Sequence, residues 1–213
     1  MRTTLYCIRH GESVFNAEGR IQGRLDVPLS PLGRRQSQAA GRALRRNPIE
    51  AIYASPLRRA WETAEVVAAE LGLPLRADDR LKEIDVGVFQ GRLRQEAKSL
   101  YPEAMAQWLS GDPDFVIPQG ESRRQLAVRG RAAFEAIGRA GHRQAVIVAH
   151  GGVLVATIKL LAGIPLPDPP LALENGSIST VGWDDMGRFH IGDLNRVDHL
   201  REVGLAGAGD LVV

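Results

Sequence analysis

A run of five apolar residues at 145–149, Ala-Val-Ile-Val-Ala, places the strongest constraint on the fold of this chain. A strand without polar alternation must be buried on both faces, which is typical of parallel sheets that carry helices on both sides. The run leads directly into His150, Gly151 and Gly152, and residues 153–161 then have the pattern of a helix. The sequence therefore predicts a buried strand followed at once by a helix, as in α/β sheets.

The same alternation recurs along the chain. Apolar or extended patterns predict strands at residues 5–9, 51–54 and 75–83, and a closing pair at 177–183 and 188–194 joined by a turn at 184–187. Helical patterns cover residues 31–46, 57–71, 93–109 and 122–139. Ser30 is a suitable N-cap, and Pro31 suits the first helical position. We expect a three-layer α/β sandwich with a mostly parallel, mixed central sheet flanked by helices.

Length and composition favour one domain. A chain of 213 residues, of which 44% are hydrophobic, can bury a single sizeable core, so we expect one domain over residues 1–213. Frequent glycines and prolines predict an insertion that covers a site at about 84–120. Residues 165–170 should form a stiff connector, and residues 200–213 a mobile C-terminal tail.

Charge and cysteine content exclude several classes of partner. A formal charge of +2 is too small to indicate nucleic acid, and no segment approaches the roughly 18 apolar residues of a membrane span. The first apolar run is too short for a signal peptide and continues into Arg9 and His10. Cys7 is the only cysteine and cannot form an internal disulfide, which favours a reducing compartment. We therefore expect a cytoplasmic protein.

Polar side chains gather where the predicted strands end. In open α/β sheets, ligands bind at the carboxyl ends of the strands, so residues there are candidate site residues. They are Arg9 and His10 at the end of the first strand, Ser55 with Arg58 and Arg59 after the second, Glu83 at the end of the third, and His150 and Gly151 after the fourth. The sequence thus predicts two histidines, two or three arginines and one carboxylate at a single rim.

This combination of side chains suits the transfer of a phosphoryl group. A neutral imidazole can attack phosphorus and form a phosphohistidine, which divides one displacement into two. Guanidinium groups bind phosphoryl oxygens with forked donors, and they disfavour a protonated histidine beside them. A carboxyl group such as Glu83 can protonate the leaving alcohol and then take a proton from the attacking water.

The motifs that contain these residues resemble the histidine phosphatase superfamily, whose best-known branch is the cofactor-dependent phosphoglycerate mutases. The resemblance extends from residue 3 to about residue 195 and rests on several motifs in order. They are Arg9-His10-Gly11-Glu12, Asn16, Gln22-Gly23, Ser55-Pro56-Leu57-Arg58-Arg59-Ala60 with Thr63-Ala64, Glu83 with Gly87 and Gly91, and His150-Gly151-Gly152. The resemblance implies a phosphoglycerate mutase-like fold.

The resemblance also implies a role for each matched residue. His10 is then the phosphorylated nucleophile, and Glu83 is the proton donor. The phosphate pocket is completed by Arg9, Arg59 and His150, and the positions that contact phosphate or substrate are Asn16, Gln22, Gly23 and Gly151. Arg58 falls on a variable position and should be solvated. The resemblance implies no metal and no organic cofactor, a small phosphorylated metabolite as partner, and a homodimer as a common assembly.

Two departures from the mutases point to the phosphatase branch. The mutases carry a tryptophan after the Gln/Thr-Gly pair, where this chain has Arg24. They also carry a longer segment after the acidic residue than the one from Glu83 to Gly120-Glu121-Ser122. We therefore expect a metal-independent phosphatase of small phosphomonoesters. Its substrate stays open among sugar phosphates, phosphoglycerates, phosphoserine and a nucleotide-loop precursor such as α-ribazole phosphate.

Several alternatives stay open from the sequence. A phosphoglycerate mutase would need a bisphosphorylated primer, and a non-catalytic regulator would keep the phosphate pocket without turnover. A phosphatase of protein or peptide phosphates would need a wide pocket. A metal site on His10 and His150 is disfavoured because the arginines would repel a cation. Glu83 could instead pair with a surface arginine, and Trp108 could serve as a substrate platform or pack in the core.

Overall fold

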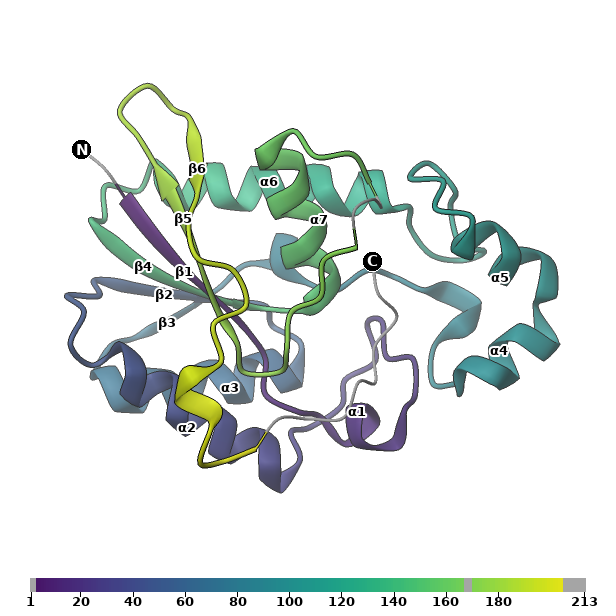
Figure 1. Ribbon diagram of the computed structural model, residues 1–213, viewed down its shortest axis with the longest axis horizontal. Helices are drawn as coiled ribbons and strands as arrows, with labels where there is room; N and C mark the ends of the chain where they lie inside the picture. Colours follow the sequence, from purple (N-terminus) through teal and green to yellow (C-terminus); the bar gives the residue numbers. More distant parts are fainter. Residues whose placement is uncertain (1–2, 167–169, 205–213) are drawn as a thin grey trace.

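The computed structural model describes residues 3–166 and 170–204, and a twisted sheet forms its middle layer (Figure 1). Within these residues six strands lie in the order β3-β2-β4-β1-β5-β6. Their bounds are Thr3–Arg9 (β1), Ala51–Ala54 (β2), Leu75–Ala77 (β3), Gln144–Ala149 (β4), Ile178–Trp183 (β5) and Phe189–Ile191 (β6). Strands β1 to β4 are parallel to one another, while β5 pairs antiparallel with β1 and β6 pairs antiparallel with β5. This confirms the predicted mixed, mostly parallel sheet.

Helices pack on both faces of this sheet (Figure 1). Helices α2 and α3 cover one face, and α6 and α7 cover the other. The α-helices of the described residues are Val14–Glu18 (α1), Pro31–Leu44 (α2), Arg58–Leu71 (α3), Arg94–Leu100 (α4), Pro102–Leu109 (α5), Arg123–Gly138 (α6) and Gly151–Ala162 (α7). Short 3-10 turns lie at Asp79–Leu81 (η1), Gly87–Phe89 (η2) and Asp198–Leu200 (η3). The predicted three-layer sandwich is therefore confirmed.

The position of β4 between two layers of helices explains why its sequence lacks polar alternation. Val146 and Val148 belong to the core against α2 and α3, whereas Ala145, Ile147 and Ala149 belong to the core against α6 and α7. All five side chains are fully buried. Both faces of the strand therefore bury apolar area, which stabilises the fold by about 25 cal/mol for each Å² removed from water.

The start of α2 approaches the end of β1 closely enough to exclude side chains. Ser30 caps the helix, since its Oγ accepts a hydrogen bond from the N–H of Gly33 at 3.0 Å. A Cβ placed on Gly33 would lie 2.0 Å from the carbonyl oxygen of Glu12, and one on Gly11 would lie 2.3 Å from the carbonyl oxygen of Gly33. This contact between backbones fixes the loop that follows β1.

Three predicted elements differ from the structure. The helix predicted over 93–109 is divided into α4 and α5, because Pro102 has no N–H to continue α4 and restricts Tyr101 before it. The strand predicted over 75–83 ends at Ala77, because the Asp78 side chain accepts the N–H of Arg80 at 2.9 Å and starts η1. The last strand covers only Phe189–Ile191 of the predicted 188–194. The turn at 184–187 forms as expected, with Gly187 N–H donating to the carbonyl of Asp184.

The connector and tail predictions fall partly outside the described residues. Residues 167–169 of the connector and 205–213 of the tail are not described, so stiffness and mobility there stay predictions. Within the described part of the tail, Leu200 is buried at the end of η3. No helix among residues 3–166 and 170–204 is both long and apolar enough to cross a bilayer.

Candidate active site

Hydrogen bonds define which nitrogen of His10 carries the proton. His10 follows β1, is buried, and lies beside β4, where its backbone N–H donates to the carbonyl of Ala149. The ring Nδ1 lies 2.7 Å from the carbonyl oxygen of Gly11, an acceptor, so Nδ1 must carry the hydrogen. Nε2 then keeps its lone pair and accepts the Nε–H of Arg59 at 3.2 Å. The nitrogen with the lone pair thus faces a fixed positive charge.

The surroundings of His10 keep the ring neutral. Burial lowers its pKa well below the ordinary value of 6.5, and the charges of Arg59 and Arg9 lower it further. The carbonyl of Gly11 acts in the opposite direction but does not compensate. A neutral imidazole is the form that can act as a nucleophile.

Arg59 lies at the start of α3 and is held rigidly. Its Nη1 donates to the carbonyl of Leu25 at 3.0 Å and its Nη2 to the carbonyl of Gly23 at 2.8 Å. The side chain is 1% exposed, so the guanidinium has one fixed orientation at His10. Neighbouring Arg58 is exposed, as the resemblance implied, and it pairs with Glu62.

His150 lies at the N-terminus of α7, directly after β4. Its ring centroid is 5.1 Å from that of His10, and its Nε2 is hydrogen-bonded to Oγ of Ser55 at 2.7 Å. Burial lowers the pKa of His150 well below 6.5, with further lowering by Arg59 and by His10. The strand ends of β1, β2 and β4 therefore bring the two predicted histidines together, both neutral.

The carboxylate of Glu83 is bound at the start of α7. Its Oε2 accepts the N–H of Gly152 at 2.9 Å, and its Oε1 accepts the N–H groups of Val153 at 3.0 Å and of Ile84 at 2.8 Å. The first N–H groups of a helix have no partner within the helix and bind anionic groups. Glu83 therefore lies beside His150, as predicted, although it reaches this place from a loop and not from the end of a strand.

Arg9 and Gly151 lie next to each other at the same helix start. Arg9 is 8% exposed, and its Nη1 donates to the carbonyl of Leu173. A Cβ on Gly151 would lie 3.4 Å from Nε of Arg9, so the guanidinium runs along the first residue of α7. Both the arginine and the helix N-terminus present positive charge to this region.

Three side chains from the loop after β1 complete the arrangement. Ser13 caps α1, and its Oγ lies 2.9 Å from Oδ1 of Asn16 and 2.7 Å from Oε1 of Gln22. Ser13 thereby links both predicted substrate-contacting side chains. Gly23 joins them through its carbonyl, which accepts Arg59. All nine predicted site residues therefore lie in one contiguous group of contacts around the ends of β1 and β4.

Sequence reasoning missed Asn175. Its Nδ2 donates to the carbonyl of His10 at 3.0 Å and to Oδ1 of Asn16 at 3.3 Å, and the side chain is buried. Asn175 comes just before β5, which is antiparallel to β1. The start of an antiparallel strand meets the same rim as the end of a parallel one, but the sequence pattern does not show that β5 runs antiparallel to β1, so it carried no signal for Asn175.

Two other predicted side chains have structural roles. Trp108 is 1% exposed, so it cannot serve as a substrate platform. The guanidinium of buried Arg123 stacks on its ring at 3.4 Å from the centroid. Glu12 accepts the hydroxyl of Ser30 at 2.6 Å and so fixes the start of α2.

The described part of the chain offers no obvious site for a metal ion. Residues 3–166 and 170–204 contain no group of three or more His, Cys, Asp or Glu side chains placed to hold a metal ion. Arg9 and Arg59 lower the pKa of both His10 and His150, and the same two positive charges would repel a cation bound there.

Comparison with known proteins defines the family. The family model of the histidine phosphatase superfamily (branch 1) matches residues 5–196. The chain therefore belongs to the histidine phosphatase superfamily, which confirms the resemblance found in its motifs. The fold and the group around His10 agree with this assignment.

Relatives of the chain are named both as phosphatases and as mutases. A protein of Hydrogenobacter thermophilus named "Putative phosphoserine phosphatase 2" is 32% identical over 93% of this chain and 98% of its own length. The "Probable phosphoglycerate mutase GpmB" of Klebsiella pneumoniae is 38% identical over 84% of each chain. The solved structure of a mycobacterial glucosyl-3-phosphoglycerate phosphatase in complex with VO3 is similar with a TM-score of 0.82, at 31% identity, over 91% of this chain and 98% of that one.

Proposed function

We propose that this protein is a phosphatase that hydrolyses small phosphomonoesters through a phosphohistidine on Nε2 of His10. The observation that carries the proposal is the state of this ring. Its Nδ1–H is turned to the carbonyl of Gly11, and its Nε2 lone pair lies at the Arg59 guanidinium in a buried, cationic site. A phosphoryl group bound by Arg59 would lie next to the nucleophilic nitrogen.

In the first step of the proposed reaction, Nε2 of His10 attacks phosphorus and the bond to the ester oxygen breaks. Arg9, Arg59 and His150 would hold the phosphoryl oxygens, together with the backbone N–H of Gly151 at the start of α7. Protonated Glu83 would give its proton to the leaving alcohol. Asn16, Gln22 and the Gly23 turn would contact the substrate beside this group.

In the second step, water attacks the phosphohistidine. The Glu83 carboxylate would take a proton from the water as the new P–O bond forms and the P–N bond breaks. Inorganic phosphate leaves, and His10 returns to its neutral state. Each step needs positioned charges and a proton carrier, so the proposal includes neither metal nor organic cofactor.

The phosphatase branch is proposed over the mutases because Arg24 stands where the mutases carry a tryptophan. The Arg24 guanidinium lies 3.2 Å from Oε1 of Glu121 and 3.6 Å from Oδ2 of Asp85, so it links the two ends of the segment at about 84–120 that is predicted to cover the site. This segment carries α4 and α5, which lie on the side of the molecule toward which β1 and β4 run (Figure 1). We propose that it covers the site as a short lid that still admits water.

Release of inorganic phosphate tests the proposal directly. The purified protein is incubated with a panel of phosphomonoesters that includes phosphoserine, 3-phosphoglycerate, glucosyl-3-phosphoglycerate, sugar phosphates and α-ribazole phosphate. EDTA is present and no bisphosphoglycerate is added. We expect release from at least one member, which would also rank the substrates. Isomerisation of phosphoglycerate that appears only with bisphosphoglycerate would identify a mutase, and a need for metal would exclude the phosphohistidine route.

The remaining predictions about partners follow from the same proposal. A small phosphorylated metabolite is the expected ligand. Homodimer formation and a cytoplasmic location stay predictions that size-exclusion chromatography with light scattering and cell fractionation would test.

A further inference from the structure

The proposed proton donor lies in a segment without regular secondary structure. Strand β3 ends at Ala77, η1 ends at Leu81 and η2 begins at Gly87, so Glu83 lies on an irregular stretch between them. A carboxyl group that must meet a leaving oxygen needs a fixed position, because a displacement of about 1 Å can cost 100-fold in rate. The backbone that carries Glu83 must therefore be held by contacts other than a strand ladder or a helix.

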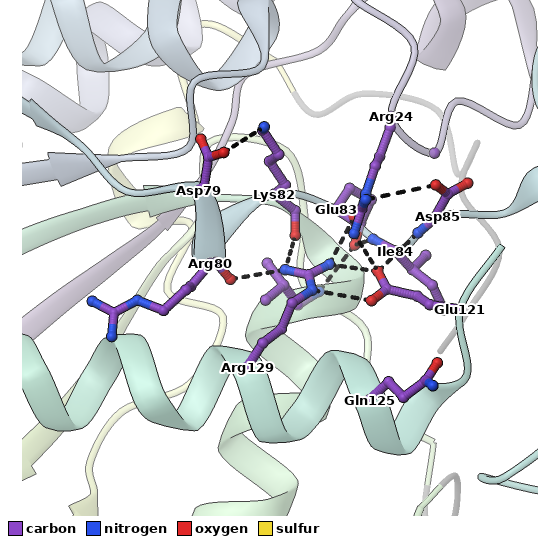
Figure 2. Close-up of polar contacts among 12 residues, drawn as sticks. Arg24, Asp79, Arg80, Lys82, Glu83, Ile84, Asp85, Glu121, Gln125 and Arg129 are labelled. Atoms are coloured by element: carbon purple, nitrogen blue, oxygen red, sulfur yellow. Dashed lines mark hydrogen bonds and ion pairs between the residues drawn. The ribbon is translucent and has the colours of Figure 1, made fainter.

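Arg129 of α6 supplies these contacts (Figure 2). Its Nη1 donates to the carbonyl of Arg80 at 2.8 Å and to that of Lys82 at 2.5 Å, and its Nη2 donates to the carbonyl of Glu83 itself at 2.8 Å. The side chain is 19% exposed. One guanidinium thus binds three carbonyl groups of the segment that ends at the proton donor.

Glu121 orients the guanidinium from the other side (Figure 2). Arg129 donates from Nε to Oε2 of Glu121 at 3.1 Å and from Nη2 to Oε1 at 2.6 Å, so every N–H of the guanidinium has an acceptor. Oε1 also accepts the backbone N–H of Asp85 at 2.9 Å. Burial acts to raise the pKa of Glu121, but the hydrogen bond and charge of Arg129 outweigh burial and leave this pKa below 4.5. The backbone is therefore held on both sides of Glu83.

We infer that Arg129, oriented by Glu121, is a positioning residue that holds the Glu83 carboxyl group at the start of α7 for proton transfer. The inference rests on the proposed phosphatase function and adds a residue to it. We refer to Arg129, Glu121 and the backbone of residues 80–85 as the carbonyl clamp. Binding three carbonyl groups and a carboxylate with one side chain requires arginine, because a lysine ammonium lacks the planar fork that reaches several acceptors at once.

A comparison of two leaving groups separates positioning from a general loss of structure. An alkyl phosphate needs its leaving oxygen protonated, whereas p-nitrophenyl phosphate needs little protonation. We expect Arg129→Gln to lower kcat on the alkyl ester by about ten-fold or more, with a much smaller loss on the aryl ester and little change in KM. Arg131→Gln is the matched control, because Arg131 lies on the same helix and pairs only with Glu135 at the surface among its described contacts. Equal losses of Arg129→Gln on both esters would overturn the inference.

A double-mutant cycle tests whether Arg129 acts through Glu83. If it does, adding Arg129→Gln to Glu83→Gln should change kcat on the alkyl ester by less than about two-fold, because the group it positions is already gone. Losses that multiply would mean an independent role and would contradict positioning. Arg129→Lys provides the same cycle if the glutamine variant does not fold.

Amide hydrogen exchange gives a readout that does not depend on turnover. Loss of the clamp should speed exchange at the N–H groups of Ile84, Gly152 and Val153, which donate to the Glu83 carboxylate, while Arg131→Gln leaves them unchanged. If the wild-type protein releases phosphate from no ester, the proposed function is wrong. The exchange rates of these N–H groups then test by themselves whether Arg129 holds Glu83 in place. Unchanged exchange in both Arg129 variants would refute it.

Discussion

Burial of two neutral histidines should make the stability of this protein depend on pH in a defined way. His10 and His150 both have pKa values well below 6.5 in the folded protein, because burial and the nearby arginines disfavour their charged forms. In the unfolded chain both should titrate near the ordinary value of 6.5. Below this pH the unfolded chain binds protons that the folded protein does not bind.

The sign and the size of the effect follow from this difference. The stabilising contribution is complete above pH 6.5 and is lost as the pH falls from 6.5 toward the folded pKa values. Each histidine removes up to about 1.4 kcal/mol of unfolding free energy per pH unit. Between about pH 7.5 and 5.5 each should remove roughly 1.4 kcal/mol, and the pair roughly 2.7 kcal/mol.

Urea denaturation at several pH values measures the effect. The wild-type protein is compared with His150→Gln and with the double variant His10→Gln/His150→Gln in buffers without phosphate, since bound phosphate would stabilise the fold. The gap between wild type and His150→Gln should shrink by roughly 1.4 kcal/mol between about pH 7.5 and 5.5. If the free energies of unfolding of wild type and both variants change equally with pH over this range, the histidines are not held neutral. The argument that His10 is a neutral nucleophile would then be wrong.

Three further substitutions test the site and its support. His10→Asn should abolish phosphate release and leave no acid-labile phosphoprotein after mixing with substrate; near-normal turnover would exclude the phosphohistidine mechanism. Glu83→Gln should slow alkyl esters more than aryl esters, whereas equal losses would count against its role as the acid. Gly33→Ala should lower the free energy of unfolding by about 3 kcal/mol or more, because its Cβ would lie 2.0 Å from the carbonyl of Glu12; urea denaturation that matches wild type would contradict this close approach.

The sequence allowed the fold and most of the site to be predicted because their signals are local. A run such as 145–149 can be stable only between two layers, and residues at strand ends meet at one rim once the sheet is parallel. The break at Pro102 is equally local, since proline ends a helix by its own geometry, but our prediction of one helix over 93–109 was wrong because it ignored this signal. These features depend on a few neighbouring residues.

The features that could not be predicted depend on contacts between distant segments. Asn175 reaches His10 only because β5 runs antiparallel beside β1, and the strand pattern alone does not give that direction. The role of Arg129 depends on where three carbonyl groups point in an irregular loop, which no residue type reveals. Glu83 was placed correctly at the rim but on the wrong kind of element, because the capping side chain of Asp78 ends β3 early.

The order of the strands has a consequence for the synthesis of the protein. Strand β1 is made first, yet Leu5 pairs with Ala145 on one side and with Val181 on the other. Strand β2 pairs with β3 and with β4, so until residue 149 has been made β2 can pair only with β3, and β1 has neither of its native neighbours. Such distant pairing slows folding and exposes apolar strand edges to other chains. Chains that stop before β4 should therefore aggregate, and His10, the proposed nucleophile, meets its native partners Ala149 and Asn175 only after most of the chain has been made.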